Sequence, residues 1–354
     1  MSERWISELT RQGAQFSDGR VTAFGDTNNP AAAYTALQNG AVLCDLSQFG
    51  LMLATGEEAA AFLHGQFCND VLALGDSAAQ WNGWCSPKGR LLVSLLAWSG
   101  KQGVYSLLPR SLQPAIQKRL QMFILRAKVK LSDESDNWVR FGVAGASAEA
   151  LLRATVGAVP VDVMSTVHTE AGHIIKLSAT RFIVVASPNN AIALWNQLSD
   201  APMHATKAGA SVWDWLSIQQ GIITVLPETQ DAFVPQMANF ELIGGVSFKK
   251  GCYPGQEIVA RTQYRGILKR RMVLAHVTAA TSPVPGEKLY SDGFGDQAAG
   301  EVANVAPSPD GGFEMLVVAQ IAAINDNNLK YAAPDGLAVT IKPLPYALPL
   351  PQPA

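Results

Sequence analysis

The sequence lacks the features that would place it in a specialised class of protein. Its 27 lysines and arginines nearly cancel its 29 aspartates and glutamates, so the whole molecule has no field that attracts nucleic acid or a membrane surface. No segment approaches the roughly 20 apolar residues of a membrane-spanning helix. The N-terminus mixes charged and polar residues where a secretory signal has an apolar core. We therefore expect a cytoplasmic protein with no membrane contact.

Cysteine and histidine are also scarce. The four cysteines, Cys44, Cys68, Cys85 and Cys252, lie far apart, with no C-x-x-C pair and no ligand-like spacing to the five histidines. This pattern predicts neither a disulfide framework nor a metal site, and the thiols should be reduced. The first three cysteines have apolar or turn surroundings without basic neighbours, so we expect them to be packed. The scattered histidines suggest no catalytic dyad.

What is present is an ordinary globular composition. The 354 residues are 48% hydrophobic, enough for two or three domains. Periodicity predicts helices at 56–66, 111–125, 147–157 and 189–200, and strands at 90–98, 103–109, 126–132, 139–145, 173–179 and 180–187. This alternation predicts two α+β units in which helices cover antiparallel strands.

The pattern changes after residue 266. Strand-like segments at 271–278, 314–324 and 337–345 are separated by turn-rich sequence and show little helical periodicity. They predict a C-terminal antiparallel β domain, barrel-like, over residues 271–345. Residues 346–354 are rich in proline, which removes backbone donors, so they should form a tail.

The segment 249–266, KKGCYPGQEIVARTQYRG, carries the strongest functional signal. Seven basic residues and one acid lie between residues 249 and 271, a formal charge of +6 in a nearly neutral protein. Gly251 and Gly255 flank Cys-Tyr-Pro. This spacing predicts a tight turn that follows an apolar strand at 244–248 and presents Cys252.

The sulfur of Cys252 is the predicted reactive atom of this turn. Lys249, Lys250 and Arg261 would favour its thiolate, which is the form that attacks electrophiles or binds metal. From the residues alone, a packed cysteine on a solvated loop is an equal alternative. Glu257 lies four residues before Arg261, which predicts a salt bridge on a helix, with a catalytic base as the alternative.

KGCYPGQE followed by IVAR and YRG resembles the signature of the YgfZ family of folate-binding proteins. The resemblance extends to LSQFGLMLATGEEAAAFLHGQFCNDV, CSPKGRLL, FVPQMANFELIGGVSF and IKPLPY, and so covers most of the chain. The family is related to the aminomethyltransferase T-protein of glycine cleavage. The resemblance implies an α+β, three-domain ring around a central folate cavity. Its parts would be a first α+β domain at 1–50 and 135–265, an inserted α+β domain at 51–134, and the β-barrel at 271–345.

The resemblance also implies where a folate binds. Tetrahydrofolate, or a one-carbon derivative of it, needs a stacking surface, polar groups for the pterin and positive charge for its glutamate tail. Trp213 and Phe49 occupy positions where the family has aromatic folate contacts, with core packing as the alternative for both. Arg261 and Arg265 could meet the glutamate tail, although surface solvation explains them equally well.

The implied function is tetrahydrofolate-dependent support of iron–sulfur enzymes, including enzymes that modify tRNA. Cys252 would engage a cluster, a sulfur species or a one-carbon adduct. Lys250 would support its thiolate, and Tyr253 and Gln256 would shape the turn. The partners are then folate and client enzymes. We expect no direct tRNA contact, because the basic segment shows no interleaved exposed aromatic residues. The oligomeric state stays open.

Two other functions stay open, and so does turnover itself. In the T-protein an acidic residue acts on the folate nitrogen, but the aligned positions here are Val93 and Ser94, and neither can act as a carboxylate base. A folate-dependent aminomethyltransferase is therefore the second choice, unless Asp45 or Asp70 replaces the acid. The third is a thiol redox or metal-handling protein with a vestigial folate pocket.

Overall fold

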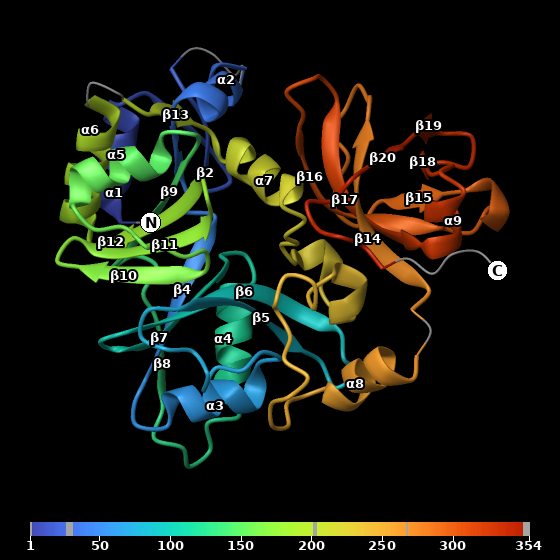
Figure 1. The fold of residues 1–354 in the computed structure, drawn as a ribbon, viewed down its shortest axis with the longest axis horizontal. Coiled ribbons are helices and arrows are strands. Elements are labelled where there is room, and N and C mark those ends of the chain that lie inside the picture. The colour runs from blue at the N-terminus through green and yellow to red at the C-terminus, as the bar shows by residue number, and fades with distance from the viewer. Residues whose placement is uncertain (1, 26–30, 201–203, 267, 350–354) are drawn as a thin grey trace. The chain divides into compact units, whose positions relative to one another are not determined.

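The computed structural model describes residues 2–25, 31–200, 204–266 and 268–349 (Figure 1). Its internal contacts divide the chain into two compact units, each built from several segments. Unit 1 is Met1–Leu63, Val71–Gln80 and Leu96–Trp213, and unit 2 is His64–Asp70, Trp81–Leu95 and Asp214–Ala354. The three-domain boundaries expected from the sequence stay a prediction.

Helices and strands alternate, which confirms the α+β class. The helices are α1 (Glu3–Arg11), α2 (Ala31–Asn39), α3 (Ala59–Gln66), α4 (Gln113–Gln121), α5 (Ala148–Val156), α6 (Pro188–Asp200), α7 (Ala210–Gln219), α8 (Gln256–Tyr264) and α9 (Ile321–Asn325). Within the described ranges, none of them has both the length and the apolar character needed to cross a membrane.

The strands fall into three larger sheets and a small hairpin of β1 (Ala14–Ser17) and β2 (Arg20–Phe24). The others are β3 (Val42–Asp45), β4 (Phe49–Thr55), β5 (Ala79–Cys85), β6 (Leu91–Gly100), β7 (Gly103–Pro109), β8 (Lys130–Asp133), β9 (Val139–Ala144), β10 (Ser165–Thr169), β11 (Gly172–Ser178), β12 (Arg181–Ala186), β13 (Thr206–Ala208), β14 (Arg270–Val277), β15 (Lys288–Tyr290), β16 (Gly300–Pro307), β17 (Phe313–Gln320), β18 (Lys330–Tyr331), β19 (Leu337–Ala338) and β20 (Thr340–Lys342).

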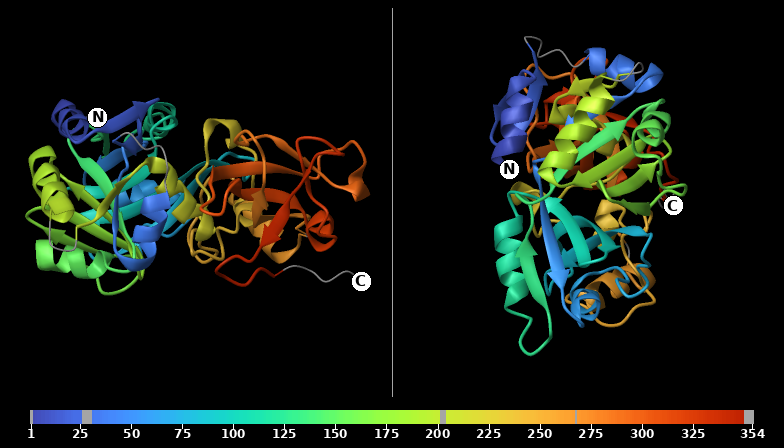
Figure 2. Two further views of the ribbon diagram at one scale, coloured as in Figure 1. Left: turned by 90° about the horizontal axis from the view of Figure 1, so that it is seen from above. Right: turned by 90° about the vertical axis from the view of Figure 1, so that its left-hand side faces the viewer.

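The core of unit 1 lies on a six-stranded sheet with the order β10-β11-β12-β9-β3-β13 (Figures 1 and 2). Its neighbouring strands pair antiparallel, except for β3 and β13, which are parallel. Alternate residues of β9, Phe141 and Val143, face the same side, as the two-residue period of a strand requires. There they pack against α1, α5 and α6. Trp5 of α1 and Trp195 of α6 meet edge to face at 5.2 Å in this core.

A second sheet has the order β5-β6-β7-β4-β8, and α4 packs on β4. The helix expected at 56–66 begins only at Ala59. Gly56 has a φ of 110°, and a Cβ there would lie 2.1 Å from the carbonyl oxygen of Lys128, so its backbone is held outside the helix. The helix expected at 111–125 likewise shortens to α4, followed by turns in which Leu125 has a φ of 39°.

The C-terminal part of unit 2 forms the expected antiparallel sheet, with the order β19-β18-β15-β16-β17-β14-β20. The central pair, β14 and β17, is in register from Arg270 opposite Gln320 to Val277 opposite Phe313. Only Val339 separates the two edge strands along the chain, so the sheet nearly closes on itself. The strand expected at 314–324 stops at Gln320, where α9 begins.

The beginning of the expected tail is attached to unit 2. The hydroxyl of Tyr346 donates to the carbonyl of Gly221 at 2.9 Å. Burial raises the pKa of Tyr346 to about 12. The remaining tail residues 350–354 lie outside the described residues.

A histidine pair lies in the sheet of unit 1, where His168 of β10 faces His173 of β11. Their Nδ1 atoms are 2.7 Å apart, and Nε2 of His168 lies 2.9 Å from the carbonyl oxygen of Asp76. His168 therefore donates to that carbonyl, and His173 donates to His168. The rings of Tyr105 and Trp138 also enclose His173. Burial, and then His168, lowers the pKa of His173 to about 4.

We predict that His173 weakens the fold in acid. Its pKa of about 4 lies below the ordinary 6.5, so the unfolded chain binds more protons between these pH values. The free energy of unfolding should fall by roughly 3 kcal/mol from this group as pH drops through the window. Urea denaturation of His173→Phe should show a correspondingly flatter pH dependence, whereas His204→Phe, at an exposed site, should leave it unchanged. An equally steep profile in His173→Phe would refute the assignment.

Candidate functional site

Residues 249–255 form an irregular turn that ends where α8 begins. Gly255 has a φ of 77°, and a Cβ there would lie 2.3 Å from the carbonyl oxygen of Ser86. Gly89 has a φ of 69°, and its Cβ would lie 2.8 Å from the Cβ of Ile258. The two glycines allow the CSPKG turn to touch the start of α8. Two of the segments that carry the resemblance therefore meet here.

The residues before the turn, 244–248, form no strand, so that prediction was wrong. They are held instead by the FCND segment. The backbone amide of Ser247 donates to the carbonyl of Cys68 at 3.0 Å, and Nδ2 of Asn69 donates to the carbonyl of Gly244 at 2.7 Å. These contacts with a loop replace the regular pairing of a sheet. A third segment of the resemblance thus joins the site.

Lys250 is buried, and its ammonium group caps α3. Nζ donates to the carbonyl of His64 and, at 2.6 Å, to that of Phe67. Positive charge is favourable at the carbonyl end of a helix. Nζ also lies 5.0 Å from the ring centroid of Tyr253. Burial lowers the pKa of Lys250 to about 8, and the nearby thiols and Asp70 act in the opposite direction.

Cys252 is exposed, whereas the other three cysteines are buried, as expected. The preceding residue, Gly251, lies beside an imidazole that the sequence did not single out. A Cβ on Gly251 would lie 3.5 Å from Nε2 of His64. On the other side of that ring, Nδ1 lies 3.0 Å from a carboxylate oxygen of Asp70. The residue before Cys252 therefore lies next to a histidine–aspartate pair.

This pair escaped prediction because its spacing follows no regular element. His64 belongs to the last turn of α3 and Asp70 to the loop after it, six residues on. The contact has the distance of an ion pair but not the alignment of a hydrogen bond. The signal available in the sequence was HGQFCND, which lies inside the segment that carries the resemblance.

Two buried thiols, those of Cys68 and Cys85, lie near Tyr253 of the turn. The contact with Cys68, and then burial, raises the pKa of Cys85, and Sγ of Cys68 donates to the carbonyl of Gly245 at 3.3 Å. Burial, followed by these two thiols, raises the pKa of Tyr253. Cys85 and Tyr253 are therefore neutral at ordinary pH. Gln256 closes the turn, because its Nε2 donates to the carbonyl of Gly251 at 3.4 Å.

Trp213 is 2% exposed in α7. The guanidinium carbon of Arg181 lies 3.9 Å from its ring centroid, and Nη2 of Arg181 donates to its carbonyl at 3.1 Å. Gly142 makes room for the ring, since a Cβ there would lie 2.2 Å from Cζ3. Its neighbours in unit 1 are those of a packed residue, and its stacking on folate stays a prediction.

Phe49 is half-buried at the start of β4, and its carbonyl accepts from Nη2 of Arg140. Beside it lies a residue that the sequence did not reveal. Both amide atoms of Gln48 are buried, and neither has a hydrogen-bond partner among the described residues. A buried amide whose donor and acceptor are both unsatisfied is rare in a folded protein and calls for a partner.

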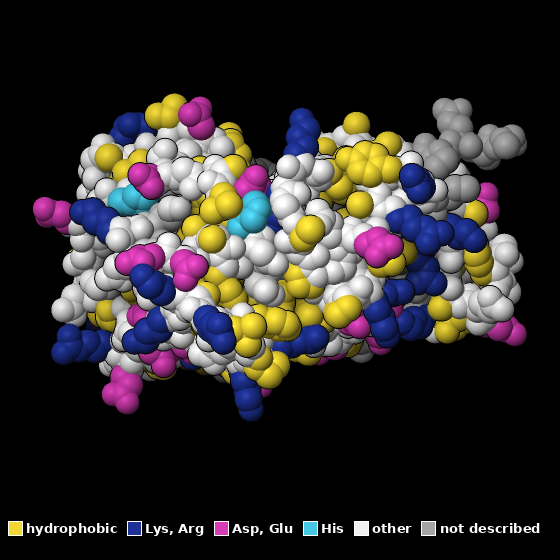
Figure 3. All heavy atoms as spheres, turned by 90° about the horizontal axis from the view of Figure 1, so that it is seen from below, with side chains coloured by type: hydrophobic (Ala, Val, Ile, Leu, Met, Phe, Trp, Pro, Cys, Tyr) yellow, Lys and Arg dark blue, Asp and Glu magenta, His cyan; other side chains and the backbone are white. Residues whose placement is uncertain are grey.

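Arg261 of α8 and Arg265, which directly follows the helix, are exposed. The predicted salt bridge between Glu257 and Arg261 was wrong, because no ion pair joins them within the described chain. Figure 3 shows lysine and arginine side chains gathered over the part of the molecule that contains α8 and the start of β14. These cations are therefore available to an anion.

The aligned acid positions hold no carboxylate. Val93 is fully buried, and Oγ of Ser94 accepts a hydrogen bond from the amide of Val225 at 2.9 Å. Asp45 lies fully buried in unit 1, where the indole N–H of Trp5 donates to it at 2.7 Å. Burial raises the pKa of Asp45.

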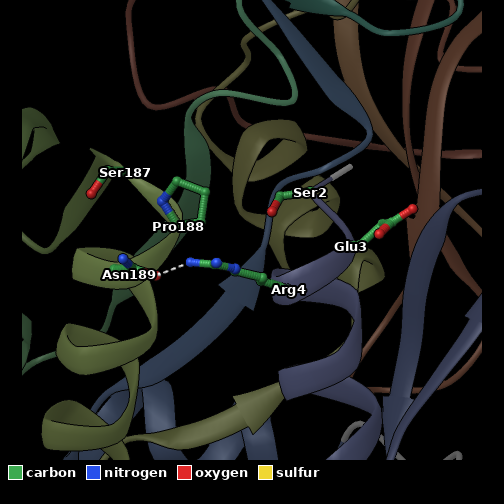
Figure 4. A pocket seen from close by; sticks show the side chains of 6 residues that line it. All are labelled: Ser2, Glu3, Arg4, Ser187, Pro188 and Asn189. Carbon is green, nitrogen blue, oxygen red and sulfur yellow. Dashed lines mark hydrogen bonds between the residues drawn. The ribbon is translucent and has the colours of Figure 1, made fainter.

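An open hollow lies apart from these residues, where α1 and α6 begin (Figure 4). It is lined by Ser2, Glu3, Arg4, Ser187, Pro188 and Asn189. Arg4 donates to Asn189 across it at 3.0 Å. None of the residues predicted from the sequence lines it.

Comparison with known proteins identifies the family. Residues 13–250 match the GCVT N-terminal domain. The tRNA-modifying protein YgfZ of Klebsiella pneumoniae (strain 342) is 30% identical over 314 residues, which cover 86% of this chain and 93% of that protein. The chain belongs to the YgfZ family. The YgfZ of Photobacterium profundum is also 30% identical, over 70% of this chain and 73% of its own.

The fold of this YgfZ-family chain is shared with a T-protein. Glycine cleavage system aminomethyltransferase T from Bartonella henselae matches with a TM-score of 0.80, over 98% of this chain and 97% of its own. The two sequences are 14% identical, so this likeness concerns the fold. It confirms the expected relation to the T-protein fold.

We predict that the adjacent lysines of this turn differ sharply in their effect on stability. Lys250→Met would leave the carbonyls of His64 and Phe67 buried without their donor. The free energy of unfolding should fall by about 1–3 kcal/mol, measured by urea denaturation. Lys249→Met is the matched control at an exposed site and should change it by less than about 0.5 kcal/mol. Equal effects would contradict the capping role.

Proposed function

We propose that this protein binds a reduced folate and supports the iron–sulfur clusters of client enzymes, including enzymes that modify tRNA, through the thiol of Cys252. The observation that carries this proposal is the exposure of Cys252 on a turn held by buried Lys250 and by two closely packed glycines. Such a turn presents one thiol in a fixed place. The name of the relatives, tRNA-modifying protein YgfZ, supports the link to tRNA.

His64 and Asp70 extend the chemistry of this thiol. A thiol must lose its proton before it can bind a metal or attack an electrophile. The imidazole of His64 lies beside the backbone of the turn and can take that proton, while Asp70 stabilises the imidazolium that results. Lys250 holds the turn against α3 and adds a positive charge near the thiolate.

Residues of unit 1 fit one part of a folate. The unsatisfied amide of Gln48 offers a donor and an acceptor to a pterin, and the ring of Phe49 offers an apolar surface. When bound, a reduced folate supplies one-carbon chemistry at its ring nitrogens. Gln48 and Phe49 would bind and orient its pterin. Arg261 and Arg265 of unit 2 stay predicted partners of folate carboxylates.

An aminomethyltransferase remains the second candidate because of the shared fold. The packing of Val93 and the engaged hydroxyl of Ser94 provide no carboxylate at the aligned positions, and Asp45 is enclosed. A cytoplasmic, thiol-dependent accessory role for this YgfZ-family chain therefore has more support than catalysis of glycine cleavage. Release of methylene-tetrahydrofolate from an aminomethyl donor would reverse this order.

We predict that Gln48→Leu weakens tetrahydrofolate binding by about tenfold, because two hydrogen bonds to the pterin are lost. Anaerobic calorimetric titration would measure the change. Gln297→Leu makes the same chemical change at an exposed site and should bind normally. Trp213→Ala tests the other predicted contact through the loss of fluorescence quenching on binding. Unaltered affinity in Gln48→Leu would remove that residue from the folate site.

We predict that Cys252→Ala fails to restore iron–sulfur enzyme activity in cells that lack the protein. The variant should fold normally, because the side chain is exposed. Cys44→Ala, which removes a buried thiol from β3, should restore activity. Thermal melts followed by circular dichroism would show that both are folded. Full restoration by Cys252→Ala would defeat the thiol role and leave folate binding to be judged separately.

A further inference from the structure

The outer face of α8 has an unusual composition. Four exposed residues of the helix and its C-cap residue, Arg265, recur at helical spacing, which places them on one side of the helix. They are Glu257, Ile258, Arg261, Tyr264 and Arg265. A face made only to contact water would not need a large aromatic ring. Tyr264 is 70% exposed, and Ile258 is 40% exposed.

Apart from Arg270, which is half-buried, the structure divides the basic residues of this region into two groups. Lys250 and Arg271 are buried and bound to internal partners, the latter to Glu241 and to the carbonyl of Gln236. The exposed group is Lys249, Arg261, Arg265 and Lys269. Within the part of the chain that the structure describes, none of these four side chains forms an ion pair. Glu257 is the single acid on the face.

Lysine and arginine side chains without an ion-pair partner repel one another when they lie close together, and a bound polyanion relieves that repulsion. Arg261 lies three residues before Tyr264 on α8, and Arg265 directly follows Tyr264. Lys249 directly follows Phe248, whose ring meets that of Tyr264 at 6.1 Å. Lys269 is the next exposed cation along the chain. Positive charge therefore lies beside the exposed ring.

Tyr264 adds a requirement that a simple anion does not satisfy. Its ring is inclined at 71° to that of Phe248, so Phe248 supports it without stacking face to face. A supported and exposed aromatic ring between cations is what single-stranded nucleic acids use, with a base on the ring and phosphates on the cations around it. The expectation of no direct tRNA contact assumed that such a ring was missing.

We propose that this face of α8 binds single-stranded RNA. One unpaired base stacks on Tyr264, and adjacent phosphates contact Arg261, Arg265, Lys249 and Lys269. A base-paired helix would not fit as well, because its bases are already stacked on each other. RNA is favoured over DNA because the relatives are named for tRNA modification. The proposal requires neither folate binding nor the thiol.

The first experiment tests stacking. A short, unstructured, fluorescein-labelled oligoribonucleotide is titrated with the full-length protein at low salt and followed by anisotropy, without folate. Tyr264→Ala should weaken binding about tenfold or more, and Tyr264→Phe should bind within about twofold of the unchanged protein. Inorganic polyphosphate, which carries charge without bases, should bind Tyr264→Ala as it binds the unchanged protein. Equal losses for RNA and polyphosphate would overturn the proposal.

The second experiment tests which positively charged side chains contact the phosphates of the RNA. For single strands the slope of log affinity against log salt changes by about 0.7 for each phosphate contact, so Arg261→Gln/Arg265→Gln should lower its magnitude by about 1.4. Lys118→Gln/Arg126→Gln removes the same net charge from an exposed part of unit 1 and should leave the slope unchanged. Similar effects of the two double variants would show that binding follows net charge, which contradicts a site on α8.

Three further outcomes decide the matter. A transfer RNA with unpaired loops should compete with the oligonucleotide, and a fully paired RNA duplex should compete poorly. Stronger binding of the matching oligodeoxyribonucleotide would contradict the choice of RNA. Absence of RNA binding at low salt, with all variants shown to be folded by circular dichroism, would overturn the inference, whatever the results for folate and Cys252.

Discussion

The contact between the ammonium group of Lys250 and the end of α3 determines where the rest of the site lies. The two carbonyls that it binds belong to His64 and Phe67, and the first is 186 residues earlier in the sequence. The same helix end carries the imidazole that lies next to Gly251 and the loop that leads to Asp70. One buried charge therefore fixes both the turn that bears Cys252 and the acid–base pair beside it.

Charge in this protein has two separate uses within a short stretch of chain. Lys250 and Arg271 are enclosed and satisfied by carbonyls or by a carboxylate, and burial of each is tolerable only with those partners. The side chains of Arg261 and Arg265, by contrast, are exposed to solvent. Arg261 and Arg265 are therefore shared by two proposals, as cations for folate carboxylates and for RNA phosphates. The second would place a polyanion on the helix that follows the turn of Cys252.

Much of the fold followed from the sequence because periodicity reflects burial. The alternation at β9 and the helical spacing of α5 and α6 appear almost unchanged in the structure. The strand expected at 244–248 failed because apolar residues beside two glycines suit a loop as well as a strand, and tertiary hydrogen bonds decide between them. Lys249 and Lys250 are neighbours of the same type in the sequence, and only the packing of the fold makes the first exposed and the second buried.

The site was less predictable than the fold. The motif pointed correctly to an exposed Cys252, but His64 and Asp70 meet through the path of a loop, which no local pattern encodes. The role of Gln48 could not be predicted either, because whether an amide finds a hydrogen-bond partner depends on the residues that surround it in the fold. Conversely, Glu257 and Arg261 have ideal spacing for a salt bridge and do not form one, because spacing permits such a pair without requiring it.

The closure of the C-terminal sheet at Val339 has a consequence for the way this chain behaves among other molecules. Exposed strand edges are templates on which another chain can add a strand, and proteins commonly protect them with charge, proline or covering loops. Here the two edge strands, β19 and β20, follow one another directly, and the amide of Val339 between them donates to Leu329. A domain whose edges are tied to each other offers little for aggregation or strand exchange, even at the end of the chain.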